Sequence, residues 1–209
     1  MASWLARSKV RNILTKSAVE RKAVLWDDAM MNLSSAYQWL EREPGPKVLL
    51  EMKKIHGVRE MPGSADNPAI LAWADELGDK VGIDYQHDSE AWCGITAGIV
   101  AQRAGYEPPN ICVRASSWDG FGNPVSGAPM LGDFLRFQRP GGGHIGLYVG
   151  EDKDAFHVWG GNQADSVSIA RISRARLVTA RRCPWKTGQP SNVRRVFLSP
   201  SGAISGNEA

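Results

Sequence analysis

The chain has few of the residues that build metal centres and disulfide frameworks. It contains three cysteines and four histidines in 209 residues, with no Cys-x-x-Cys pair and no His-Glu-x-x-His run, so the sequence offers no zinc site. Three cysteines cannot all be paired. Cys112 and Cys183 could form one bridge and leave Cys93 free. We favour three reduced thiols, two of them buried as small apolar residues.

Other absences exclude further classes of protein. No apolar run approaches the length of a membrane span. The basic N-terminal segment lacks an uninterrupted apolar core and a small-residue cleavage site, so we expect no secretory signal. No Gly-x-Ser-x-Gly elbow is present, and Gly141-Gly142-Gly143 lacks the lysine and helix of a phosphate-binding loop. The formal net charge of +3 is mild, and we expect no nucleic-acid partner.

A cysteine, a histidine and an asparagine occupy positions typical of a cysteine hydrolase. Cys93 stands at the start of an apolar, small-residue stretch that predicts a buried helix, and a helix N-terminus lowers a thiol pKa. His144 opens an apolar strand about fifty residues later, and Asn162 follows the next strand. A thiol nucleophile needs a histidine base and a polar group that orients it. The sequence therefore predicts Cys93, His144 and Asn162 as catalytic residues.

The two strands that precede Asn162 should form an antiparallel hairpin. Residues 145–149 and 156–159 are apolar and are joined by a polar turn. If Gly150 opposes Phe156, then His144 opposes Asn162 and both side chains point to the same face. A slip of one residue would put them on opposite faces.

The sequence divides into three parts. Residues 1–46 are predicted to form a helical arm, which Pro44-Gly45-Pro46 ends. Residues 47–185 are predicted to form one α+β domain, with helices first and strands from residue 111 onward. Residues 186–209 are rich in Ser, Gly, Pro and Asn and are predicted to be irregular.

The arm is predicted from apolar residues that recur at intervals of four and three: Trp26, Met30, Leu33, Tyr37 and Leu40. Such a stripe indicates either a helix packed on the domain or an anchor for a partner, and we rate the two alternatives evenly.

Several segments, in this order, resemble the CHAP and NlpC-type branch of papain-like cysteine peptidases. They are Trp92-Cys93, residues 129–134, residues 143–150 and Gly160-Gly161-Asn162-Gln163. With residues 57–63 and Asn67-Pro68, they look most like a phage-associated subgroup of peptidoglycan hydrolases. The resemblance covers residues 47–185. It implies a papain-like fold in which a helix layer carrying the cysteine packs on an antiparallel β-sheet carrying the histidine.

The resemblance also implies an activity and a setting. The chain would be an endopeptidase or N-acetylmuramoyl-L-alanine amidase that cuts an amide bond in the stem or cross-link of bacterial peptidoglycan. It would be phage-encoded, either a virion or tail component or an endolysin that stays in the host cytoplasm before release to the wall. Residues 1–46 would then contact other phage structural proteins.

By the same resemblance, Cys93 is the nucleophile, His144 the base and Asn162 the orienting residue. Some relatives carry an acidic residue two positions before the orienting residue. In this chain that position, two before Asn162, is Gly160. An upstream side chain should help stabilise the oxyanion, and Gln86 and Tyr85 are the rival candidates. Three tryptophans could line the substrate groove, although core packing is the alternative for each: Trp92, Trp118 and Trp159.

Several alternatives stay open. We expect no cofactor, but Asp84, Asp88 and Glu90 could bind calcium, as in some CHAP-like domains; without EF-hand spacing, a solvated acidic loop is the simpler interpretation. A second hypothesis for the whole chain is a non-catalytic structural or binding component of a phage tail that retains the papain-like fold. A transglutaminase-like transfer, in which an amine captures the thioester, is a third.

Overall fold

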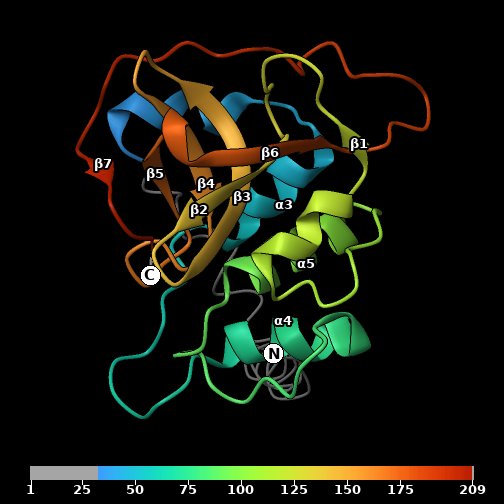
Figure 1. Cartoon of the computed structure of the whole chain (residues 1–209), viewed down its shortest axis with the longest axis vertical. Helices are drawn as coiled ribbons and strands as arrows, with labels where there is room; N and C mark the ends of the chain where they lie inside the picture. The colour runs from blue at the N-terminus through green and yellow to red at the C-terminus, as the bar shows by residue number, and fades with distance from the viewer. Residues whose placement is uncertain (1–32, 209) are drawn as a thin grey trace, which may run out of the picture. The chain divides into compact units, whose positions relative to one another are not determined.

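The structure is a computed structural model that describes residues 33–208, and it shows an α+β fold (Figure 1). The helices are η1 (Ser35–Arg42), α3 (Lys47–Ile55), α4 (Pro68–Leu77), η2 (Gly78–Lys80), α5 (Cys93–Arg103), η3 (Ala115–Gly120) and η4 (Arg174–Arg176). The strands are β1 (Asn123–Pro124), β2 (Phe134–Arg139), β3 (Gly142–Glu151), β4 (Ala155–Gly160), β5 (Ser168–Ser173), β6 (Leu177–Arg182) and β7 (Ile204–Ser205).

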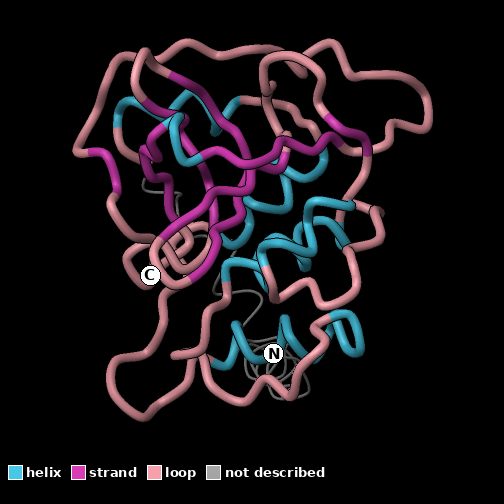
Figure 2. Tube along the Cα trace, viewed as in Figure 1, coloured by secondary structure: helices cyan, strands magenta, loops and turns pink. Residues whose placement is uncertain are grey.

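The strands form one sheet in the order β1-β6-β2-β3-β4-β5-β7. Every pairing is antiparallel except that of β5 with β7. The long helices precede the sheet along the chain, and α4 and α5 lie side by side (Figures 1 and 2). Within residues 33–208, no helix combines the length and apolar character needed to cross a bilayer.

The helix that begins at Cys93 is buried, as its sequence predicts. Residues 93–101 are all buried, and α5 packs on α3 and α4 as well as on β3 and β4. Small residues permit this close packing. A Cβ on Gly94 would lie 2.2 Å from the carbonyl oxygen of Cys112, and one on Gly98 would lie 3.1 Å from the Cys112 sulfur. The Gly94 position therefore holds the start of α5 directly against the backbone of residues 112–113.

The β3–β4 hairpin differs from its predicted register at one point. Leu147 pairs with Trp159 as predicted, but a bulge beyond Tyr148 makes Gly150 pair with His157 rather than with Phe156. At the other end β4 stops at Gly160, so the ladder does not reach Asn162. Asn162 lies in the following turn with a φ of 54°, and the predicted opposition of His144 and Asn162 is wrong.

The compact unit begins at Leu33, earlier than the predicted boundary at residue 47. Tyr37, on η1, donates or accepts a buried hydrogen bond of 2.7 Å with His157 Nδ1 on β4. Glu43 is buried and pairs with Arg194 at 3.0 Å. Residues 33–46 are therefore part of the domain, whereas residues 1–32 of the predicted arm lie outside the described residues.

The C-terminal segment is mostly irregular, as predicted, but it is an integral part of the domain. β7 adds to the edge of β5, and Glu208 is only 1% exposed. Arginines hold the end of the segment: Arg176 donates to both Glu208 carboxylate oxygens at 2.8 and 2.6 Å, and Arg139 donates to Asn207 at 2.7 Å. Because Arg139 ends β2, these contacts tie the tail to the edge of the candidate site described next.

Candidate active site

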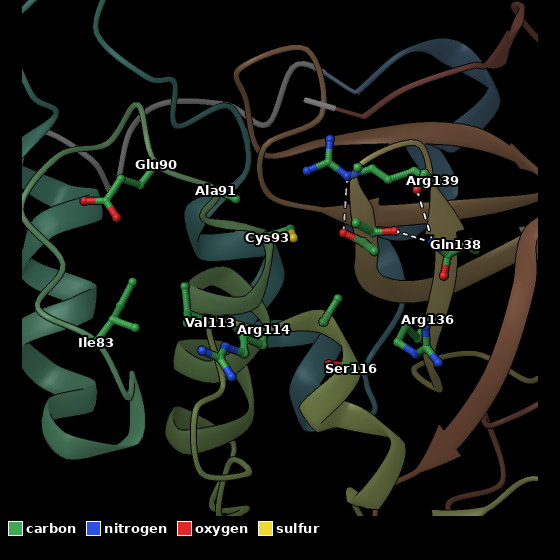
Figure 3. Close-up of a pocket in the computed structure, with 14 residues that line it drawn as sticks. Ile83, Glu90, Ala91, Cys93, Val113, Arg114, Ser116, Arg136, Gln138 and Arg139 are labelled. Atoms are coloured by element: carbon green, nitrogen blue, oxygen red, sulfur yellow. Dashed lines mark hydrogen bonds between the residues drawn. The ribbon is translucent and has the colours of Figure 1, made fainter.

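Cys93 lies at the N-terminus of α5 and lines a surface cavity of about 550 Å³ (Figure 3). All three cysteines are free, in agreement with the sequence interpretation, and all three are buried. Cys112 and Cys183 do not line this cavity. Cys93, although only 3% exposed, is thus the thiol that borders a space large enough for a ligand.

Opposing effects act on the Cys93 thiol. Burial raises its pKa above the usual value. The backbone N–H groups of Ile145, Gly94 and Cys93 itself, with the positive charge of Arg139, act in the opposite direction. These N–H groups include those left free at a helix N-terminus, which favour the thiolate. The net result is a neutral thiol at rest, surrounded by donors that stabilise negative charge as soon as it forms.

His144 lies on β3 next to Ile145, whose backbone N–H acts to lower the pKa of the Cys93 thiol. Its Nε2 is 3.0 Å from Gln163 Oε1. The Gln163 amide is held in this orientation because its Nε2 donates to the carbonyl oxygens of Val158 and Ser168. An amide oxygen only accepts, so His144 Nε2 carries the hydrogen and Nδ1 keeps the lone pair. The imidazole is therefore in the tautomer that can take a proton through Nδ1.

Gln163, and not Asn162, is the residue that orients the histidine. Asparagine tolerates the left-handed conformation of the turn after β4, and this turn brings the next residue to the imidazole. Gly160 belongs to the same arrangement, since a Cβ there would lie 3.3 Å from both His144 Nε2 and Gln163 Oε1. An acidic side chain at this position would crowd the His144–Gln163 pair. Gly-Gly-Asn is a typical turn sequence, which agrees with a turn role for Asn162.

The predicted oxyanion donors do not border the Cys93 cavity. Gln86 is exposed and its side-chain amide donates to Asp84, whereas the Tyr85 hydroxyl donates to the Glu90 carbonyl oxygen at 3.2 Å. Neither residue lines the cavity. The donors that the structure places at the thiol are backbone N–H groups.

The three tryptophans predicted to line the groove are core residues, because each is 0% exposed. Trp92 donates to Glu60, Trp118 to the Cys112 carbonyl oxygen and Trp159 to His56. Trp118 also stacks on Phe134, with ring centroids 4.8 Å apart. Their size was a poor signal for a groove, since large aromatic residues stabilise cores more often than they line sites.

Charged residues that the sequence interpretation missed surround His144. Burial lowers the pKa of His144 to about 4, and Arg139 and Arg176 act in the same direction. Glu208 and the Gln163 hydrogen bond act against this effect. Glu208 comes from the tail, which composition alone marked as irregular, so nothing local in the sequence pointed to it.

The lowered pKa of His144 predicts a loss of stability in acid. The unfolded chain takes up the proton near pH 6.5, whereas the folded chain does so only near pH 4. The contribution of His144 is therefore complete above pH 6.5 and is lost between pH 6.5 and 4. At pH 5 the loss should be roughly 2 kcal/mol. Denaturant unfolding at pH 7.5 and 5 should show a smaller difference for His144→Gln than for the native protein.

The comparison with His144→Gln is needed because burial also lowers the pKa values of His56 and His157, and these add a pH dependence of the same sign. Equal pH dependence in the native protein and His144→Gln would contradict the buried, neutral state of His144.

Gly161 is the point at which α5 contacts the turn that carries Gln163. A Cβ on Gly161 would lie 1.9 Å from Thr96 Oγ1 and 2.8 Å from Trp92 Cε3. We expect Gly161→Ala to lower the free energy of unfolding by about 3 kcal/mol, because both neighbours belong to a packed helix. Gly127→Ala is the matched control, since nothing lies within 4 Å of its Cβ position. Equal denaturation midpoints for the two variants would contradict this packing.

The acidic loop before Cys93 has a structural function in this fold. Asp88 is 1% exposed and accepts hydrogen bonds from the backbone N–H groups of Met61 and Asn67. Asp84 accepts from Gln86. Over residues 33–208, no three His, Cys, Asp or Glu side chains are grouped as metal ligands. Calcium binding at this loop stays an untested alternative to the expectation of no cofactor, and a calcium titration would decide between them.

We compared the chain with known proteins. Neither the models of protein families nor the curated protein sequences gave a match.

Proposed function

We propose that this protein is a papain-like cysteine hydrolase that cuts an amide bond in the peptide part of bacterial peptidoglycan. One arrangement supports the proposal above all: a thiol at a helix N-terminus lines a cavity, and the adjacent strand carries a histidine whose tautomer is fixed by Gln163. The α+β fold, with the cysteine on a helix and the histidine on an antiparallel sheet, agrees with this proposal.

The residues would act in a defined order. His144 Nδ1 takes the proton of Cys93, and the thiolate attacks the amide carbonyl carbon. Backbone N–H groups at the start of α5 stabilise the tetrahedral oxyanion. His144 then gives its proton to the leaving amine, which departs and leaves a thioester on Cys93. Water, deprotonated by His144, attacks the thioester and releases the carboxylic acid and the free thiol.

The choice of peptidoglycan rests on the resemblance to phage-associated CHAP and NlpC-type enzymes. That resemblance also supports a phage virion or tail component, or an endolysin, acting as an endopeptidase or amidase. Residues 1–46 are the proposed contact with other phage proteins. Because residues 33–46 pack in the domain, residues 1–32 would have to supply most of that contact.

A non-catalytic component of a phage tail is the second candidate, and the burial of His144 favours it. This imidazole is only 1% exposed and does not line the cavity beside Cys93. Such a component would bind peptidoglycan or a phage protein without cutting it.

Digestion of purified peptidoglycan distinguishes the two candidates. The native protein should release soluble fragments, and mass spectrometry of their new amino and carboxyl ends identifies the bond. Walls with different cross-links should be tested, with and without calcium. Binding to these walls without release of any fragment would support the non-catalytic component instead.

A further inference from the structure

The cavity beside Cys93 contains an excess of positive charge. Three arginines line it, Arg114, Arg136 and Arg139, against one acidic residue, Glu90. Arg136 is neutralised by Asp119, to which it donates at 2.7 and 2.8 Å. Among the described residues, neither Arg114 nor Arg139 has a carboxylate within 4.0 Å. Two guanidinium groups thus line the cavity without an anionic partner.

Arg139 is held in place at the end of β2. Its Nε donates to the Gly143 carbonyl oxygen at 3.3 Å, and its Nη1 donates to Asn207 at 2.7 Å. Both acceptors are neutral, so the positive charge is not compensated. That charge is close enough to the site to lower the pKa of the Cys93 thiol. A fixed guanidinium loses little freedom when an anion binds to it.

The two arginines without a carboxylate partner lie on different sides of Cys93. Figure 3 shows Arg136, Gln138 and Arg139 on one side of Cys93, with Arg114, Glu90 and Ile83 on the other. On the first side the charge of Arg139 is uncompensated, whereas on the second side Arg114 and Glu90 carry opposite charges, so a negatively charged ligand group is attracted more strongly to the Arg139 side. This separation gives a bound peptide a direction relative to the nucleophile.

We propose that the cavity selects peptides with a free carboxylate close to the amide bond at Cys93, and that Arg139 binds this carboxylate. Guanidinium groups bind carboxylates with short, charge-assisted hydrogen bonds, which a neutral carboxamide makes only in part. The proposal rests on the proposed function for the identity of that peptide, a peptidoglycan stem. It adds that stems with amidated carboxylates are poor ligands.

A pair of synthetic stem peptides tests the selection. The two differ only at the carboxyl group of the second residue, a free acid in one and a carboxamide in the other. Binding is measured by calorimetry with Cys93→Ala protein, which cannot turn them over. We expect the free acid to bind about 10- to 100-fold more tightly. Adding Arg139→Gln should bring this ratio close to one, and Arg139→Lys should give an intermediate ratio.

Arg103→Gln is the matched control because Arg103 pairs with Glu76 away from the cavity. It should leave the ratio unchanged. The ratio of the two affinities is compared, and not either affinity alone, because Arg139 also acts on the pKa of the Cys93 thiol. Replacing Arg139 therefore changes more than the binding of a carboxylate. Equal affinities for the two peptides, no binding of either, or a ratio unaffected by Arg139→Gln would overturn the selection.

Turnover by the native protein separates this inference from the proposed function. Selective binding without cleavage of either peptide or of peptidoglycan would keep the carboxylate site and reject the hydrolase. Cleavage of both peptides at equal rates would keep the hydrolase and reject the carboxylate site.

Discussion

Replacing Cys93 by alanine should lower the rate of peptidoglycan hydrolysis by about 1,000-fold or more while the protein stays folded. The loss is large because, in the proposed mechanism, the thiol forms the covalent intermediate, and the remaining backbone donors cannot replace a nucleophile. The fold should survive because alanine is smaller than cysteine and suits a helix N-terminal turn. Rates of fragment release and thermal unfolding of the same preparations provide the two measurements.

Cys183→Ala is the matched control for this prediction. Cys183 is also a buried, free thiol, but it does not line the cavity. Its loss should cost stability and leave the rate per folded molecule unchanged. If Cys183→Ala and Cys93→Ala lost activity to the same extent, Cys93 would not be the nucleophile.

Replacing Gln163 should have the second largest effect on the rate. Gln163→Ala removes the group that fixes the His144 tautomer, and we expect a loss of roughly 100-fold to 10,000-fold. It also leaves the carbonyl oxygens of Val158 and Ser168 without their donor, which should cost about 1–3 kcal/mol of stability. Rates must therefore be measured well below the unfolding temperature of the variant.

Asn162→Gly separates the two neighbouring residues. Glycine adopts the φ of 54° at this position without strain, so the turn should be preserved. We expect a rate within about threefold of the native protein, because the amide of Asn162 does not orient His144. A large loss for Asn162→Gly together with a small one for Gln163→Ala would show that the orienting residue is Asn162 after all.

Local patterns in the sequence were sufficient to predict most elements of the fold. The small-residue stretch after Cys93 predicts a buried helix, and α5 is buried from Cys93 to Ala101. The sequence also predicts a strand from Leu177 to Arg182, which is β6 as observed. The helix prediction holds because small apolar residues allow α5 to pack closely on its neighbours.

What the sequence could not predict depends on bulges, turns and long-range contacts. The β3–β4 hairpin contains a bulge, and Asn162 has a left-handed backbone conformation. Together they decide which side chain contacts His144. Neither feature has a recognisable pattern in the amino-acid sequence. Glu208 approaches the site through pairing of the tail with Arg176 and β5, across long stretches of chain. For the three tryptophans, core packing was an open alternative and is what the structure shows, since composition does not tell a core aromatic residue from one that lines a groove.

Direct detection of the acyl-enzyme tests the central claim, that Cys93 attacks an amide bond with the help of His144 and Gln163. The native protein is mixed with peptidoglycan fragments, quenched in acid during turnover, digested and analysed by mass spectrometry. We predict that the peptide containing Cys93 carries the mass of the acyl part of the stem, and that His144→Gln and Gln163→Ala reduce its yield. Turnover without such an adduct, or an adduct on Cys112 or Cys183, would contradict the proposed mechanism.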